Sequence, residues 1–174
     1  MAVAGVGNIV LIGMPAVGKS TLGVLLAKAT SRNFVDTDLR IQAAERRSLP
    51  EILAAEGREG FRRIEEEAVL ALDCRETVIA TGGSVVYGER AMAHLKGCGA
   101  VVHLELPLAQ LKQRLRDLKV RGVVMAEGQT LDDLFAERAP LYRRYADVTV
   151  DCSGATHEEV LDRLCAALSC ASPR

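Results

Sequence analysis

The sequence has few aromatic residues and no tryptophan. Its 174 residues include three phenylalanines and three tyrosines, which leaves little material for stacking nucleic-acid bases or for an aromatic cage around a cation. It also lacks an excess of either charge, because 22 lysines and arginines face 23 aspartates and glutamates, for a formal net charge of -1. We therefore expect no nucleic-acid partner, and a ligand that is held by charged side chains and backbone groups.

Paired cysteine motifs and long apolar runs are also missing. The five cysteines are an odd number without C-x-x-C spacing, so neither a disulfide framework nor a zinc site is indicated and we expect free, mostly buried thiols. His94, His103 and His157 share no metal-ligand spacing, and we expect them to be structural. The first apolar run stops at Gly13, far short of the ~20 residues of a membrane span, and no basic leader precedes it. We expect a cytoplasmic protein without a membrane partner.

Short apolar runs alternate with amphipathic segments along the chain. Strands are expected at 9–12, 33–37, 77–81, 100–106 and 148–150, and helices at 19–29, 50–55, 59–73, 89–95, from 107, at 131–145 and at 158–168. The helix over 59–73 should bury Phe61, Ile64, Ala68 and Leu72. This alternation predicts the α/β class, with a parallel sheet and helices on both faces. No linker or repeat divides residues 1–174, so one domain is expected, with a disordered tail at 170–174.

The segment Gly13-Met14-Pro15-Ala16-Val17-Gly18-Lys19-Ser20 carries the most information. It matches G-x-x-x-x-G-K-[ST] and lies directly between an expected strand and an expected helix. Such a loop aims successive backbone N–H groups at phosphate oxygens, and the helix N-terminus adds partial positive charge. Lys19 can reach the terminal phosphates, and the Ser20 hydroxyl can ligate Mg²⁺. The sequence therefore predicts a nucleotide phosphate site at residues 13–20, the phosphate-binding loop.

Two acids follow the second expected strand. Asp36 and Asp38 should lie at the carboxyl edge of the sheet, on the same rim as the phosphate-binding loop. One acid could then stand near a metal ion while the other accepts a proton from an attacking hydroxyl. The alternative is structural, because Asp38 could cap the next helix.

Three arginines and a double glycine complete the candidate site. Arg62 lies beside the apolar stripe of its helix and could instead pair with Glu66, and Arg138 lies just before a proline within a helix. Arginine forks hold carboxylates or phosphates bidentately. Arg121, in a glycine-flanked stretch, could act as a lid residue over the transferring phosphate. Gly82-Gly83-Ser84, if it is more than a simple turn, would expose backbone N–H groups on the same rim.

Together these residues resemble the shikimate kinase family, which consists of small P-loop kinases similar to nucleoside-monophosphate kinases. The resemblance runs from about Asn8 to Leu168 and rests on G-M-P-A-V-G-K-S-T-L-G, F-V-D-T-D, F-R-R-I-E-E, the double glycine and E-R-A-P-L-Y-R-R-Y-A-D. It implies a five-stranded sheet in the order 2-3-1-4-5, a substrate-binding region built from the helices after the second strand, and a mobile lid at about 117–130. The implied activity is transfer of the γ-phosphoryl group of Mg-ATP to the 3-hydroxyl of shikimate.

The resemblance also implies roles for individual residues. ATP would be bound by Gly13, Ala16, Val17, Gly18, Lys19, Ser20, Thr21, Arg114 and Arg121, with Arg114 covering the adenine, and Mg²⁺ by Ser20 and Asp36. The substrate would be bound by Asp38, Arg62, Gly82, Gly83 and Arg138, with the two arginines on its carboxylate. Lys19, Asp38 and Arg121 would be the catalytic residues.

Two departures from the family pattern leave alternatives open. The family usually has a third glycine where this chain has Ser84, and Arg121 is followed by Gly122 rather than by proline. A related kinase for another small hydroxy acid or sugar acid is therefore an alternative, and an ATP-binding module without catalysis is a second one. In the leading interpretation the partners are ATP and a small carboxylated hydroxy substrate, and the protein acts as a monomer.

Overall fold

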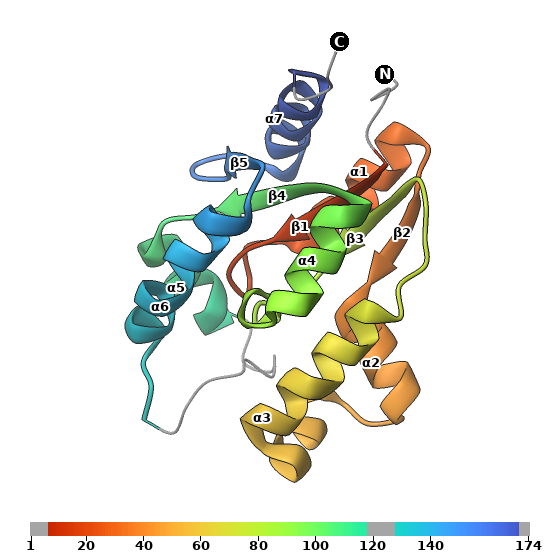
Figure 1. Cartoon of the computed structure of the whole chain (residues 1–174). Helices are drawn as coiled ribbons and strands as arrows, with labels where there is room; N and C mark the ends of the chain where they lie inside the picture. Colours follow the sequence, from red (N-terminus) through yellow and green to blue (C-terminus); the bar gives the residue numbers. More distant parts are fainter. Residues whose placement is uncertain (1–6, 118–127, 171–174) are drawn as a thin grey trace.

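The computed structural model describes residues 7–117 and 128–170 (Figure 1). Most of the expected lid, including Arg121, lies outside the described residues, as do positions 171–174 of the expected disordered tail. Residue 170, the first of that expected tail, is the last residue of a helix.

Five parallel strands form the centre of the fold. They are β1 (Asn8–Ile12), β2 (Asn33–Asp36), β3 (Thr77–Ala80), β4 (Gly99–Glu105) and β5 (Val148–Asp151). Their order is β2-β3-β1-β4-β5, and every neighbouring pair is parallel. This confirms the expected sheet. All of β1 is buried because it is the central strand and is covered on both faces, which explains its continuous apolar run.

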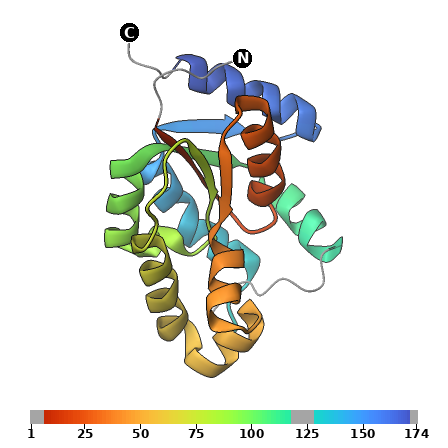
Figure 2. The same cartoon turned by 90° about the vertical axis from the view of Figure 1, so that its right-hand side faces the viewer.

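Helices cover both faces of the sheet. On one face α1 (Lys19–Thr30) packs against α7 (His157–Cys170), and α4 (Glu89–Cys98) lies on the opposite face, in contact with β4 (Figure 2). α5 (Leu108–Asp117) and α6 (Leu131–Tyr145) contact each other, and α6 also contacts β4. The main core is formed by the strands and the apolar sides of these helices.

Two helices extend beyond the carboxyl end of β2, as Figure 1 shows. α2 (Thr37–Glu45) and α3 (Leu49–Leu70) share a second, smaller core of Ile41, Ile52 and Phe61. α3 contains a kink at Gly57, where φ is 67°, so the expected break between two helices is present. α2 was not among the expected helices. It begins where the second strand was expected to continue, so that strand ends one residue earlier, at Asp36.

The buried side of α3 differs from the expected stripe. Phe61 is buried as expected, but Ile64 and Ala68 are only half-buried. Leu72 is also buried, but it lies outside the helix, because α3 ends at Leu70 and not at 73 as expected. Glu65 is buried instead, with 2% of its surface exposed. The prediction was wrong here because it used apolarity alone, whereas α3 turns a carboxylate toward the interior.

The cysteines agree only in part with the expectation of free, mostly buried thiols. All five cysteines are free, but Cys152 is the single buried one, three others are half-buried and Cys170 is exposed. Within residues 7–117 and 128–170, no helix combines the length and the apolarity needed to cross a membrane.

Candidate functional site

The phosphate-binding loop has the conformation that its glycines permit. Gly13 has φ 146° and Gly18 has φ 110°, and a Cβ atom on Gly13 would lie 2.6 Å from the carbonyl oxygen of Leu104. A side chain at Gly13 would therefore clash with the backbone of β4. Ala16 also has a positive φ, of 65°. The loop leads directly into α1, whose first residue is Lys19, so the N-terminal amides of the helix face the rim of the sheet.

Lys19 is the buried cation of this loop. Its Nζ atom donates hydrogen bonds to the carbonyl oxygens of Gly13, at 2.7 Å, and Met14, at 2.9 Å. Burial lowers the pKa of Lys19 to about 8, an effect that the nearby Asp38 carboxylate partly opposes. The phosphates of a bound nucleotide would bring further negative charge beside the ammonium group and favour its charged form.

Asp36 caps a helix and is also a candidate ligand of Mg²⁺. Its Oδ1 atom accepts hydrogen bonds from the backbone N–H groups of Asp38, at 2.9 Å, and Leu39, at 3.2 Å, which caps α2. The expectation that Asp38 could be the helix cap is therefore wrong. Both of these bonds are accepted by Oδ1 of Asp36. Asp36 and Ser20 also line one common pocket, which is described below. A carboxylate and a hydroxyl are the hard oxygen donors that suit Mg²⁺.

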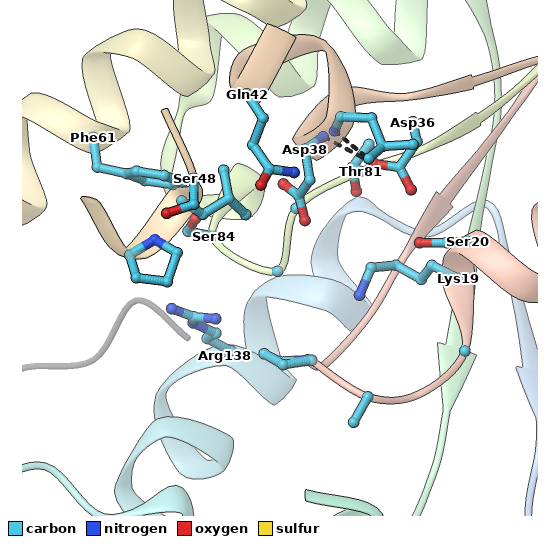
Figure 3. Close-up of a pocket in the computed structure, with 18 residues that line it drawn as sticks. Lys19, Ser20, Asp36, Asp38, Gln42, Ser48, Phe61, Thr81, Ser84 and Arg138 are labelled. Atoms are coloured by element: carbon cyan, nitrogen blue, oxygen red, sulfur yellow. Dashed lines mark hydrogen bonds between the residues drawn. The ribbon is translucent and has the colours of Figure 1, made fainter. Parts of the chain in front are cut away.

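A pocket of about 500 Å³ opens between the phosphate-binding loop, α2, α3 and the end of β3. Its volume is in the range of small-molecule sites. Figure 3 shows Lys19, Asp38 and Arg138 around this one pocket. Nine predicted site residues line it: Ala16, Gly18, Lys19, Ser20, Asp36, Asp38, Gly82, Gly83 and Arg138.

The double glycine lets carboxylates approach the backbone at the end of β3. A Cβ atom on Gly82 would lie 2.2 Å from Oε1 of Glu65 and 2.8 Å from Oδ1 of Asp38. The N–H of Gly82 donates to the hydroxyl of Thr37 at 3.1 Å, so the expectation that this N–H is exposed on the rim is wrong. Two acids therefore lie close together against a backbone position that has no room for a side chain.

Ser84 fixes one of these two acids. Its hydroxyl donates to Oε2 of Glu65 at 2.6 Å, and both residues are buried. Burial raises the pKa of Glu65 to about 7, while the bond from Ser84 opposes this rise. Ser84 also lines the pocket, as its place next to the double glycine suggested.

The two candidate carboxylate-binding arginines have different positions. Arg138 on α6 is 1% exposed and lines the pocket. Arg62 on α3 lines a small neighbouring cavity instead, with its guanidinium carbon 3.8 Å from the centre of the Tyr87 ring. The alternative pairing of Arg62 with Glu66 is wrong, since Glu66 forms its ion pair with Arg90, at 3.4 Å.

Other predicted residues lie beside the pocket rather than on its wall. The pocket is not lined by Gly13 and Val17 of the loop or by Thr21 of α1. Arg114 on α5 donates from Nη1 to the carbonyl oxygen of Val17 at 2.9 Å, so it lies against the loop. Arg121 is outside the described residues.

His94 and His103 contact neighbouring protein groups, as expected of structural histidines. His94 hydrogen bonds to the carbonyl oxygen of Leu72, and His103 stacks on Tyr142 with ring centres 5.2 Å apart. Burial lowers the pKa of His103 to about 4. Among residues 7–117 and 128–170, no three histidine, cysteine, aspartate or glutamate side chains are grouped so that they could hold a metal ion.

The sequence analysis missed two residues of this region, Glu65 and Tyr87. Glu65 follows Phe61 by four positions and precedes Val69 by four, so an i, i+4, i+8 pattern that ignores polarity would have placed it on the buried side. Tyr87 ends a short 3₁₀ helix, η1 (Val85–Tyr87), after the double glycine. No sequence pattern signalled this turn, which brings Tyr87 to Arg62 and Arg138.

Comparisons with known proteins agree on one family. The model of the shikimate kinase family matches residues 15–169. The chain is 37% identical to shikimate kinase 2 of an Enterobacter species, covering 94% of this chain and 98% of the relative. It is 39% identical to the shikimate kinase of Mycobacterium tuberculosis, covering 89% and 92%. The solved structure of shikimate kinase from Acinetobacter baumannii in complex with shikimate has a TM-score of 0.84 and 32% identity, covering 91% of this chain and 90% of that one.

Proposed function

The chain belongs to the shikimate kinase family, and from this membership we propose that it transfers the γ-phosphoryl group of ATP to the 3-hydroxyl of shikimate. The observation that carries the proposal is the meeting of Lys19, Asp38 and Arg138 in one pocket. A cation for phosphate, a base for a hydroxyl and a cation for a carboxylate are the three groups that this reaction needs.

The ATP end of the site is the phosphate-binding loop. Amides from Gly13 to Ser20 bind the β- and γ-phosphates, and Lys19 exchanges its bonds to the loop carbonyls for bonds to phosphate oxygens. Positioning and neutralisation of charge provide most of the rate enhancement in phosphoryl transfer. We also assign Val17, Thr21 and Arg114 to ATP, although they do not line the pocket, with Arg114 covering the adenine.

Asp38 and Arg138 act on the acceptor. Asp38 orients the 3-hydroxyl and accepts its proton as the oxygen attacks phosphorus. Arg138 holds the carboxylate through paired N–H groups, which fixes the ring at the end remote from the reaction. Gly82 and Gly83 line the pocket, and we assign them to contacts with the substrate.

Mg²⁺ is the ion that the donor set fits. Ser20 and Asp36 would hold it, with the remaining positions filled by phosphate oxygens and water, as is usual for Mg²⁺ in kinases. The ion supplies charge neutralisation on the transferring phosphate.

Arg62, which does not line the pocket, and Arg121, which lies outside the described residues, complete the proposal. Arg62 shares the Tyr87 ring with Arg138, so the two guanidinium groups converge on one side chain. We assign Arg62 to the substrate carboxylate with Arg138, and Arg121 to the transferring phosphate. A lid at 117–130 and a single kinase domain over 1–174 stay predictions.

Where the protein works also stays a prediction. Five free cysteines are typical of a reducing compartment such as the cytoplasm. We propose a cytoplasmic monomer that contributes to the biosynthesis of aromatic amino acids.

Ser84 favours a second candidate, a kinase for another small hydroxy acid or sugar acid. Its side chain lines the pocket where the family usually has glycine, and the hydroxyl is held by Glu65. The Ser84 side chain changes the shape of the pocket wall, and an acceptor with a different arrangement of hydroxyls could fit this wall.

A coupled assay of ADP release tests both candidates. Purified protein is given Mg-ATP and either shikimate or one of a panel of hydroxy acids and sugar acids, with Lys19→Met as the inactive control. We expect turnover that depends on shikimate. Strong turnover of another acid with negligible activity on shikimate would transfer the proposal to the second candidate, and ATP binding without turnover of any acceptor would contradict both.

A further inference from the structure

Tyr87 contacts both candidate carboxylate-binding arginines. It ends η1 at the pocket side of the sheet, between α3 and α6. The guanidinium carbon of Arg62 lies 3.8 Å from the centre of its ring, and that of Arg138 lies 5.2 Å from the same centre. Both distances are within the range of attraction between a cation and an aromatic face. With six aromatic residues in the whole chain, one ring between two arginines is a specific arrangement.

The hydroxyl of Tyr87 makes a separate contact with Arg138. The Nε–H of Arg138 donates to this oxygen at 3.1 Å. The nearby Tyr87 hydroxyl also lowers the pKa of Glu137 below its ordinary value. The bond from Arg138 therefore fixes the orientation of the Tyr87 phenol group relative to this guanidinium group.

Arg62 is held by the face of the Tyr87 ring and, among the described residues, not by a hydrogen bond at its Nε atom. That atom is buried and has no hydrogen-bond partner among residues 7–117 and 128–170. The ring face of Tyr87 is therefore a principal contact that holds the Arg62 guanidinium in place.

We propose that Tyr87 is a positioning residue that sets the spacing of Arg62 and Arg138 for the substrate carboxylate. The ring holds Arg62 by its face, and the hydroxyl occupies Nε of Arg138, which directs the terminal nitrogens of that arginine toward the pocket. This inference rests on the proposed function, because it assumes a carboxylated acceptor at Arg138.

Two substitutions separate the ring from the hydroxyl. Tyr87→Phe keeps the face and removes the acceptor for Arg138, and Tyr87→Leu removes both. We expect the KM for shikimate to rise about tenfold in Tyr87→Phe and further in Tyr87→Leu, with kcat and the KM for ATP changed by less than about twofold. Tyr145→Phe is the matched control, since Arg144 lies 5.5 Å from the Tyr145 ring centre and neither residue lines the pocket.

A second readout does not depend on turnover. In ¹H–¹⁵N spectra of the arginine Nε–H groups, Arg138→Lys identifies the signal of Arg138. We expect that signal to shift and to exchange faster with solvent in Tyr87→Phe, and we expect the Arg62 signal to shift in Tyr87→Leu. Thermal melting of each variant shows that the fold is retained, and Tyr87→Phe carries the test if Tyr87→Leu does not fold.

The outcomes separate this inference from the proposed function. If the unsubstituted protein does not phosphorylate shikimate, the proposed function fails, and the Nε–H spectra alone decide whether Tyr87 positions the arginines. Unchanged Nε–H signals in both Tyr87 variants overturn the inference. Equal rises in the KM values for ATP and shikimate also overturn it, because they indicate a general structural effect.

Discussion

Replacing Ser84 by alanine should destabilise the protein in a way that depends on pH. The substitution removes the hydroxyl that donates to Oε2 of Glu65 at 2.6 Å, in a place where both residues are buried. Alanine keeps the Cβ atom and leaves only a small void. The main consequence is therefore the loss of a donor to a buried carboxylate.

The pKa of Glu65 gives the sign of the effect. Its folded value of about 7 lies above the ordinary value of 4.5, so the folded state binds this proton more tightly than the unfolded state. The stability that the proton contributes is present at low pH and is lost as the pH rises from 4.5 to 7. The size of this loss is about 3 kcal/mol. Without Ser84 the pKa of Glu65 should rise further, and the loss should continue to higher pH.

The expected magnitudes differ between the two protonation states of Glu65. A hydrogen bond to an ionised carboxylate stabilises a protein by about 1.5–3 kcal/mol, and one to a neutral group by about 0.5–1.5 kcal/mol. Ser84→Ala should therefore lower the free energy of unfolding by about 2–3 kcal/mol near pH 8.5 and by about 1 kcal/mol near pH 5.

Urea unfolding at the two pH values measures this difference. Ser169→Ala is a matched control, because the exposed Ser169 hydroxyl donates to the backbone carbonyl of Cys165 and not to a carboxylate. In a Glu65→Gln background the pH dependence of Ser84→Ala should disappear. An equal loss of stability at both pH values would refute the reasoning, since it would mean that Ser84 does not distinguish the charged from the neutral acid.

Three further substitutions test the pocket, each by steady-state kinetics with both substrates. Arg138→Lys should raise the KM for shikimate at least about tenfold and leave the KM for ATP nearly unchanged, because lysine cannot make the paired N–H contacts; equal changes in both would contradict the assignment. Asp38→Asn should lower kcat by about 10² to 10⁴ with little change in either KM, and a kcat near that of the unsubstituted protein would exclude Asp38 as the base. Gly82→Ala should lower kcat/KM for shikimate by about 10² or more, because its Cβ atom would lie 2.2 Å from Oε1 of Glu65. Gly97→Ala is the control, since no atom lies within 4 Å of a Cβ atom at that position in α4; similar losses in the two variants would show that the effect of Gly82→Ala is not local.

The sequence predicted the parts of the site that follow from local pattern. The G-x-x-x-x-G-K-S segment requires a strand before it and a helix after it, and β1 and α1 take those places. The resemblance to the family supplied the strand order, which alternation alone does not determine. Parallel strands then brought Asp38 and Gly82 to one rim with the phosphate-binding loop.

The parts that were missed depend on tertiary contacts. α2 begins at Thr37 because Asp36 caps it, and an acid at the end of a strand does not show whether it serves as a cap or as a ligand. Glu65 is buried because Ser84 and the arginines offset its charge, and these partners come from elsewhere in the chain. Tyr87 reaches Arg62 and Arg138 only because η1 turns it between α3 and α6.

Identification of the reaction product tests the central claim most directly. The protein is incubated with Mg-ATP and shikimate, and the product is examined by ³¹P and ¹H NMR. Our account predicts one new phosphomonoester per ADP formed, with its phosphorus coupled to the proton on carbon 3 of shikimate. A phosphate on another hydroxyl, or ADP formed without any phosphorylated shikimate, would contradict it.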